Sequence, residues 1–284
     1  MAIVFDGIVF GLQLSLLAVG LTLIYGLGGV LNLAHGQFAA VAAIVGARLI
    51  GNGVGVLPAI GTAVVVAGVL AFVIDATLMR PVYRLQGEAR VLLSLLLTLG
   101  VAFTIDGLLI YNYPFTLLSL SIPGPSVNIL GVTMRSGSVV ASLIALTALV
   151  SLIVYLRYTR MGKAIRSIIQ DEEGARLVGI NPSRVRTLVF VLSGMMAGLV
   201  AITQGLISSV GATSGLNFTI FALIVTVVGG LGRVSGALLA GVLLGIVHAF
   251  ASFYIGAFVT FVILLMAAIA VILIRPSGIL GKAA

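Results

Sequence analysis

Two long stretches of this chain contain no charged residue, and they limit the folds that it can adopt. The first runs from Thr187 to Gly232 and the second from Val234 to Ile274. Each is long enough for about two membrane crossings, since one helical crossing needs roughly 20 apolar residues. The bilayer core offers no water to backbone N–H and C=O groups, so only helices and closed barrels cross it. Continuous apolar runs lack the alternation of barrel strands, and they predict membrane-spanning helices.

The composition also indicates a polytopic membrane protein. Hydrophobic residues make up 61% of the 284 positions and charged residues 8%, against about 25% charged in soluble proteins. The net charge of +8 does not indicate nucleic-acid binding, because the basic residues stand at the ends of apolar runs without interleaved aromatics. The absence of cysteine excludes disulfides, thiol catalysis and thiolate metal sites. The start of the chain, Met1 to Asp6, has no basic leader, and we expect the first span to be retained.

Apolar runs bounded by charged residues, Gly, Pro or Asn predict nine spans, with eight as the alternative. The nine cover residues 7–30, 35–53, 57–79, 91–112, 138–157, 187–209, 215–232, 235–253 and 256–275. They place most basic residues outside the spans on one side, which the positive-inside rule assigns to the cytoplasm together with the C-terminus. Only Arg48 and Arg135 oppose this orientation. We therefore expect an all-α transmembrane bundle, forming one domain over residues 1–284.

The turns at 31–36 and 232–235 are too short for ordinary loops between helices. They are also similar to each other, since Gly28-Gly29 precedes the first and Gly229-Gly230 the second. Paired broken helices expose backbone groups along the substrate path of many transporters. Glycine pairs also allow close packing between membrane helices, and the sequence leaves both interpretations open.

Residues 157–186 hold seven of the fifteen Lys and Arg and three of the seven acids. Dense polar residues and a partial helical stripe predict one or two short helices in the membrane interface, at 158–185. Gly179 can end the second helix, and Asn181-Pro182-Ser183 turns the chain back toward the membrane. One interpretation is a solvated loop that follows the positive-inside rule, with arginines that hold it at the cytoplasmic face.

The spacing of small and acidic residues favours a second interpretation. Glu173-Gly174-Ala175, three further residues and Gly179 resemble the E-A-A-x-x-x-G signature of permeases in binding-protein-dependent ABC importers, with Gly174 in place of the first alanine. In that family the helix docks in a cleft of the ATP-hydrolysing subunit. The resemblance implies these ATPase-coupling residues: Asp171, Glu172, Glu173, Gly174, Ala175, Gly179 and Asn181.

Five motifs, in the family's order, resemble the shorter permease of branched-chain amino acid importers. They are Asn32-Leu33-Ala34-His35-Gly36-Gln37, Tyr158 to Ala164, Gly179-Ile180-Asn181, Val228 to Gly232, and Arg275 to Gly281. Gln37 stands where a common variant has Glu, so no role of that acid is carried over. The resemblance implies two ATPase subunits that bind ATP and Mg²⁺, an external substrate-binding protein, and a second related permease or a second copy of this chain. It also implies a multi-pass protein of the bacterial inner membrane.

The chain itself offers no recognisable catalytic site, and we expect a non-catalytic subunit without a cofactor. Its only lysines, Lys163 and Lys282, do not complete a phosphate-binding loop. His35 and His248 are its only histidines and have few acids near them in sequence, so a metal site lacks ligands. ATP hydrolysis would then belong to a partner subunit.

Polar residues within or beside the apolar runs are the candidates for the translocation path. They are Asn32, His35, Gln37, Asp106, Gln204, Ser208 and Asn217. For Asn32 and His35 the favoured alternative is a structural hydrogen bond at the first tight turn, and for Asp106 a hydrogen bond between helices is equally plausible. We expect Asp75, near the end of its span, to pair with Arg80 or a lipid headgroup.

The function expected from the resemblance is import of branched-chain or related amino acids. An importer of urea or short amides is the alternative within this class. A self-sufficient secondary transporter or channel would need more ionisable residues in its spans than Asp75 and Asp106. A purely structural membrane subunit would leave the tight glycine turns without a purpose beyond packing.

Overall fold

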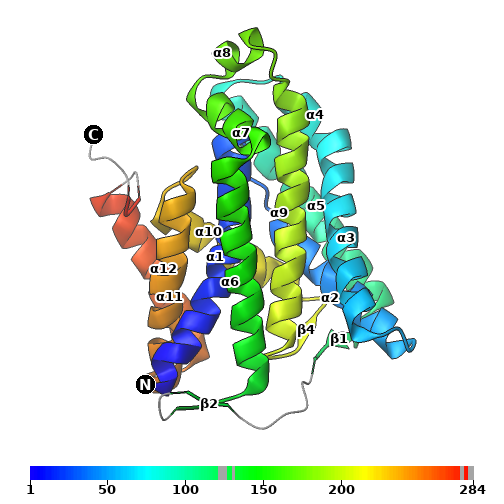
Figure 1. The fold of residues 1–284 in the computed structure, drawn as a ribbon, viewed down its shortest axis with the longest axis vertical. Coiled ribbons are helices and arrows are strands. Elements are labelled where there is room, and N and C mark those ends of the chain that lie inside the picture. Colours follow the sequence, from blue (N-terminus) through cyan, green and yellow to red (C-terminus); the bar gives the residue numbers. More distant parts are fainter. Residues whose placement is uncertain (121–126, 130–131, 276–277, 281–284) are drawn as a thin grey trace.

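The computed structural model describes residues 1–120, 127–129, 132–275 and 278–280, and it shows an upright bundle of helices (Figure 1). The apolar helices are α1 (Ala2–Gly28), α2 (His35–Gly51), α3 (Val56–Ile74), α5 (Gly87–Asn112), α6 (Ser136–Tyr158), α9 (Pro182–Gly205), α10 (Ser214–Gly229), α11 (Val234–Tyr254) and α12 (Ala257–Ile274). A π-helical turn, η1 (Asp75–Met79), and α4 (Arg80–Val82) extend α3. Within the described residues, each of the nine predicted spans corresponds to one of the nine apolar helices, which confirms the all-α bundle.

Two of the nine helices are too short to cross a bilayer on their own. Seven have the length and hydropathy of a membrane span, counting α3 to α4 as one, whereas α2 has 17 residues and α10 has 16. At 1.5 Å per residue they reach about 25 Å, against about 30 Å for the hydrocarbon core. The two short helices adjoin the two tight glycine turns, so the chain is broken where the sequence pattern is unusual. The N-terminus lies at one end of the bundle, and α12 runs from that end toward the other (Figure 1).

The end of the bundle that holds the N-terminus also carries short strands. β1 (Leu117–Leu118) pairs antiparallel with β4 (Val210–Gly211), and β2 (Val127–Ile129) pairs with β3 (Val132–Met134). The long connection from α5 to α6 is thereby joined to the segment between α9 and α10. At the other end, Pro276, Ser277, Gly281 and Lys282 lie outside the described residues, so the closing motif is only partly described.

The connection between α1 and α2 runs inside the bundle with its backbone bonded to side chains. Gly29 ends α1 with a left-handed φ of 60°. The N–H of Leu31 then donates to Ser94 Oγ at 3.2 Å, and that of Leu33 donates to Thr98 Oγ1 at 2.9 Å. Both hydroxyls come from α5. The broken-helix interpretation therefore applies to the first glycine turn.

The second glycine turn serves close packing. A Cβ on Gly236 of α11 would lie 1.8 Å from the carbonyl oxygen of Gly229, where α10 ends. The same device joins other helices: a Cβ on Gly245 would lie 2.3 Å from Gly11 Cα of α1, and one on Gly36 would lie 2.0 Å from Gly215 O of α10. Since lipid tails supply no hydrophobic drive between helices, such backbone contacts hold the bundle together.

Loss of the α5 hydroxyls should destabilise the α1–α2 connection. In Ser94→Ala and Thr98→Val, a backbone N–H loses its partner inside the bundle, which costs about 1–3 kcal/mol for each group. We expect a lower thermal midpoint in detergent and faster hydrogen–deuterium exchange at residues 29–34. Thr104→Val is the matched control, because the Thr104 hydroxyl is exposed and bonds only Gly100 O of its own helix. Equal effects of Thr98→Val and Thr104→Val would contradict the expectation.

Gly36→Ala should overfill the contact between α2 and α10. The added methyl group meets backbone atoms of Gly215 and Thr219 at 2.0 and 2.5 Å, and such overpacking costs about 1–3 kcal/mol. Gly107→Ala on α5 is the control, because nothing lies within 4 Å of its Cβ position. We expect the thermal midpoint to fall in Gly36→Ala and to stay level or rise in Gly107→Ala. A normal midpoint in Gly36→Ala would show that α2 and α10 do not meet this closely.

Candidate functional site

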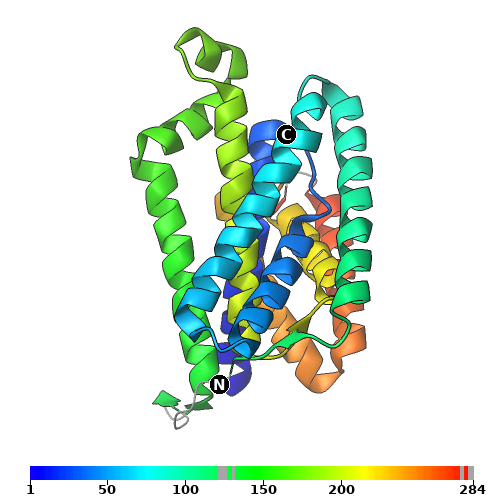
Figure 2. The same cartoon turned by 90° about the vertical axis from the view of Figure 1, so that its right-hand side faces the viewer.

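A polar cap of two short helices stands beyond the bundle, at the end opposite the N-terminus (Figures 1 and 2). The helices are α7 (Arg160–Gln170) and α8 (Glu172–Leu177), which agrees with the one or two helices expected at 158–185. A polar side chain caps the N-terminus of each helix, as is common for Thr and Asp. Thr159 Oγ1 accepts from Gly162 N, and Asp171 Oδ1 accepts from Glu173 N. Asn181 Oδ1 then accepts from Arg184 N and starts α9.

Helix α8 has a bundle side and a free side. Ala175 is buried on the bundle side, while Glu173, Leu177 and Val178 are exposed, the last two at 85% and 74%. Gly179 takes a φ of +84°, which favours glycine after the helix. Gly174, the departure from the family signature, has a local reason: a Cβ there would lie 2.5 Å from Asp171 Oδ2.

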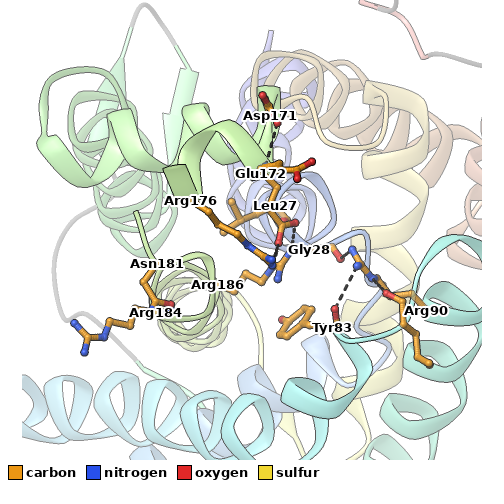
Figure 3. Close-up of polar contacts among 12 residues, drawn as sticks. Leu27, Gly28, Tyr83, Arg90, Asp171, Glu172, Arg176, Asn181, Arg184 and Arg186 are labelled. Atoms are coloured by element: carbon orange, nitrogen blue, oxygen red, sulfur yellow. Dashed lines mark hydrogen bonds and ion pairs between the residues drawn. The ribbon is translucent and has the colours of Figure 1, made fainter. Parts of the chain in front are cut away.

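The bundle side of α8 is tied to the interior by a buried arginine. Glu172 Oε2 pairs with Nη2 of Arg186 at 2.5 Å, and its Oε1 pairs with Nη2 of Arg176 at 2.6 Å. Arg186 belongs to α9 and is 5% exposed. Its Nε donates to Leu27 O at 3.4 Å, and its guanidinium carbon lies 4.8 Å from the centroid of the Tyr83 ring (Figure 3). Arg186 therefore connects α8 to the last turn of α1.

A second arginine, Arg90 of α5, caps the same end of α1. Its Nη1 donates to Gly28 O at 3.1 Å, while its Nε and Nη2 donate to Leu85 O and Tyr83 O (Figure 3). The last carbonyls of a helix lack partners within the helix and carry partial negative charge, so cations are favourable there. Arg90 and Arg186 together donate hydrogen bonds to the carbonyl oxygens of Gly28 and Leu27, at the end of α1 where the chain breaks.

Asp75 joins this network through hydrogen bonds and not through the ion pair that we expected. Its Oδ1 accepts from the Tyr83 hydroxyl at 3.1 Å, and its Oδ2 accepts from Thr187 Oγ1 at 2.5 Å. Neither of the two ion pairs among the described residues includes Asp75 or Arg80. Burial raises the pKa of Tyr83 well above its usual value, so the phenol keeps the proton that it donates. Asp75 thus links the π-helical turn of α3 to α9.

The sequence analysis missed Arg186, which it treated as a charge that holds the segment at the cytoplasmic face. Helical spacing could have found it. Pro182 starts α9, and Arg186 lies four residues later on the same face as Phe190, all three buried. No sequence spacing could have named its partners, because Leu27 is 159 positions away.

Two of the predicted path residues support the break between α1 and α2. Asn32 Oδ1 accepts from Ala34 N, and His35 Nε2 lies 3.0 Å from Leu17 O. The other ring nitrogen of His35 is 3.3 Å from Ser193 Oγ of α9. Asn32 and His35 are fully buried, and this geometry favours the structural alternative for both.

The structure brings Gln37 and Asp106 together beside α10. Gln37 lies on α2, and its side chain covers Gly215, where a Cβ would come within 1.7 Å of Gln37 Oε1. Asp106 of α5 lies near Gln37. Both residues are buried, Asp106 at 8% exposure. Neither atom of the Gln37 amide has a hydrogen-bond partner among the described residues, and nor does Asp106 Oδ1. These groups lie on one side of the first turn of α10.

A cavity of about 180 Å³ lies on the other side of that turn, between α1, α9 and α10. Two predicted path residues, Gln204 and Asn217, line it, and Gln204 Nε2 donates to Ser208 Oγ at 2.7 Å. Gln13 of α1 also lines it and is 2% exposed, and its side-chain amide has no hydrogen-bond partner among the described residues. An unpaired buried amide calls for solvent or solute in the cavity. Gln13 escaped the sequence analysis, although it is the only amide in the run 7–30.

Among the residues that the structure describes, no group of three or more His, Cys, Asp or Glu could hold a metal ion. The polar side chains form two groups: the cap with its link to α1, and the amide, hydroxyl and carboxyl groups around the first turn of α10.

Comparison with known proteins gives this architecture a family. The family model described as "Branched-chain amino acid transport system / permease component" matches residues 3–274. The high-affinity branched-chain amino acid transport system permease protein LivH of Escherichia coli is 28% identical over 98% of this chain and 94% of its own length. BraD of Pseudomonas aeruginosa, a protein of the same description, is 27% identical over the same shares. The ribose import permease protein RbsC of Escherichia coli is 25% identical over 82% of this chain and 73% of its own length. A match over nearly the whole bundle shows that this chain belongs to the branched-chain amino acid transport system permease family.

Proposed function

We propose that this chain is the transmembrane permease subunit of an ATP-driven, binding-protein-dependent ABC importer, and that it forms the translocation path for branched-chain or related amino acids. The observation that carries the proposal is the family match over residues 3–274 together with the α7–α8 cap, which stands where an ATPase subunit would dock. Two partner ATPases would bind ATP and Mg²⁺, and this subunit would perform no catalysis. The cap and the C-terminus would face the cytoplasm of a bacterial inner membrane, with an external binding protein at the opposite end.

The free side of α8 supports docking of a soluble subunit. Leu177 and Val178 expose most of their side chains beyond the apolar helices, close in sequence to Glu173, an exposed residue that forms no ion pair with the described residues. Apolar side chains gathered on a polar cap mark an interaction surface. Asp171, Gly174, Gly179 and Asn181 would act indirectly, because they shape the ends of α8 and α9, and Ala175 would seat α8 on the bundle. Glu172 would pass the movement of α8 to Arg186 and α1.

The path would follow the polar groups around the first turn of α10. Gln204, Ser208 and Asn217 would receive the solute at the outer end, with Gln13 behind them, and Gln37 and Asp106 would lie farther along. Asn32 and His35 would stabilise the connection between α1 and α2 and would not line the path. A second permease, either a sister chain or a copy of this one, would form the other wall.

The substrate is proposed from the relatives, and urea or short amides are the alternative. A relative at 25% identity is named for ribose import, so similarity to this chain does not by itself select the solute. A self-sufficient transporter or channel is a weaker alternative, because the described spans contain few ionisable groups and Asp75 is bonded within the bundle. The solute can be identified as the ligand that stimulates ATP hydrolysis by the reconstituted complex with its binding protein.

Substitutions on the free side of α8 should detach the ATPase without unfolding the permease. We expect Leu177→Asp and Glu173→Arg to reduce co-purification of the ATPase at least about tenfold, since loss of a central interface contact costs upwards of about 2 kcal/mol. Glu88→Arg is the matched control, because Glu88 is an exposed acid at the same end of the bundle but lies on α5. Thermal midpoints should be equal in all three variants. Retention of the ATPase by Leu177→Asp and Glu173→Arg would place the docking surface elsewhere, and transport without any ATPase would end the proposal.

A further inference from the structure

A basic pocket lies at the same end of the bundle as α8, beside the proposed docking surface. Its volume is about 620 Å³, and it is lined by Arg80 and Arg84 from the end of α3–α4, and by Arg176 and Arg186 from the α8–α9 region. None of the described residues that line it is acidic. We propose that this pocket binds the headgroup of an anionic phospholipid from the adjacent leaflet.

The arginines of the pocket are not fully balanced by the acidic side chains around them. Glu172 does not line the pocket but forms ion pairs with Arg176 and Arg186. Asp75 interacts electrostatically with Arg80 without forming an ion pair with it. Arg80 and Arg84 make no side-chain hydrogen bond or ion pair with the described residues. Arginine is the side chain best suited to phosphate, since its planar guanidinium donates two parallel hydrogen bonds. Glu172 and Glu173 line an adjoining pocket that shares Arg84 and Arg176. Even so, the four arginines that line the basic pocket leave positive charge in excess there.

The surface below the pocket is suited to acyl chains. Val65, Val69, Phe72 and Val73 of α3 are about half exposed, at 54%, 54%, 47% and 47%. Val69 and Val73 precede Arg80 by about three and two helical turns, so they lie below it on α3. A phosphate at Arg80 and Arg84 would place its acyl chains along this apolar strip. A basic pocket at the end of membrane helices is the usual setting for an acidic headgroup.

A lipid fits this pocket better than an acidic patch of the ATPase does. Gly179 and Asn181 of the expected coupling residues line the pocket, but the exposed residues of the docking surface, Glu173, Leu177 and Val178, do not. Arg80 of the pocket follows Val73 by about two helical turns, so the exposed apolar strip of α3 ends close to the pocket. Because the lining residues come from α4 and from the α8–α9 region, a bound headgroup would bridge these two regions.

Native mass spectrometry of the purified permease in mixed micelles tests the proposal. The probes are phosphatidylglycerol and phosphatidylcholine at equal concentration, and the variant is Arg80→Gln with Arg84→Gln. We expect the wild-type protein to retain phosphatidylglycerol in preference to phosphatidylcholine. The double variant should retain at least about tenfold less phosphatidylglycerol, since each basic residue near an anionic surface contributes about a factor of five to binding. Arg157→Gln with Arg160→Gln is the control, because these two exposed arginines lie at the α6–α7 junction at the same end. The control should keep its lipid, and thermal midpoints should show that all variants fold.

Three results would overturn the proposal. Equal losses of phosphatidylglycerol in both double variants would mean that the positive charge acts diffusely. Displacement of the lipid by millimolar inorganic phosphate would indicate a site for a free anion. Unchanged lipid retention with loss of the ATPase in Arg80→Gln, Arg84→Gln would assign the pocket to the partner protein. The lipid measurement needs no transport activity, so its failure is distinct from failure of the proposed function.

Discussion

The need to satisfy backbone hydrogen bonds away from water is the constraint on which the rest of this structure depends. A chain of continuous helices would meet it alone, but α1 ends at Gly28 and α2 begins only at His35. Four of the backbone groups exposed by this break are bonded to side chains of other helices. Arg90 and Arg186 take the last carbonyls of α1, and the Ser94 and Thr98 hydroxyls take the N–H groups that follow. Helices α5 and α9 are thereby fixed to the break.

The same contacts give the bundle a mechanical link to its polar cap. Arg186 is buried and donates to α1, yet its charge is balanced by Glu172 on α8. Removal of one partner from such a pair leaves an uncompensated buried charge, which is strongly unfavourable. Movement of α8 would therefore carry the end of α1 with it. In the proposed importer, this link passes the ATPase cycle to the break between α1 and α2, next to the polar groups along α10.

The sequence predicted the helices well because charge and glycine mark their ends. The spans expected at 91–112 and 138–157 became α5 (Gly87–Asn112) and α6 (Ser136–Tyr158). The two unusual turns were also found: a helix ends at each of them, and the second also brings Gly229 and Gly236 into close contact. Side-chain partners were not predictable in this way. Asp75 bonds Thr187 from 112 positions away, and Gln13 faces a cavity made by three helices, so both depend on packing that no local pattern contains. The roles of the path residues stay predictions.

The most direct measurement is the distance between spin labels within the assembled complex, with and without ATP. The chain has no cysteine, so labels can be placed at Gln170 beside α8 and at Ala89 beside Arg90, both exposed. If Arg186 joins α8 to the end of α1, this distance within one permease stays constant during the ATPase cycle, while the distance from Gln170 to the second permease changes. In Arg186→Gln, the distance within one permease should broaden. A change of the Gln170–Ala89 distance in the unsubstituted complex on ATP binding would contradict the link, because α8 would then move independently of the bundle.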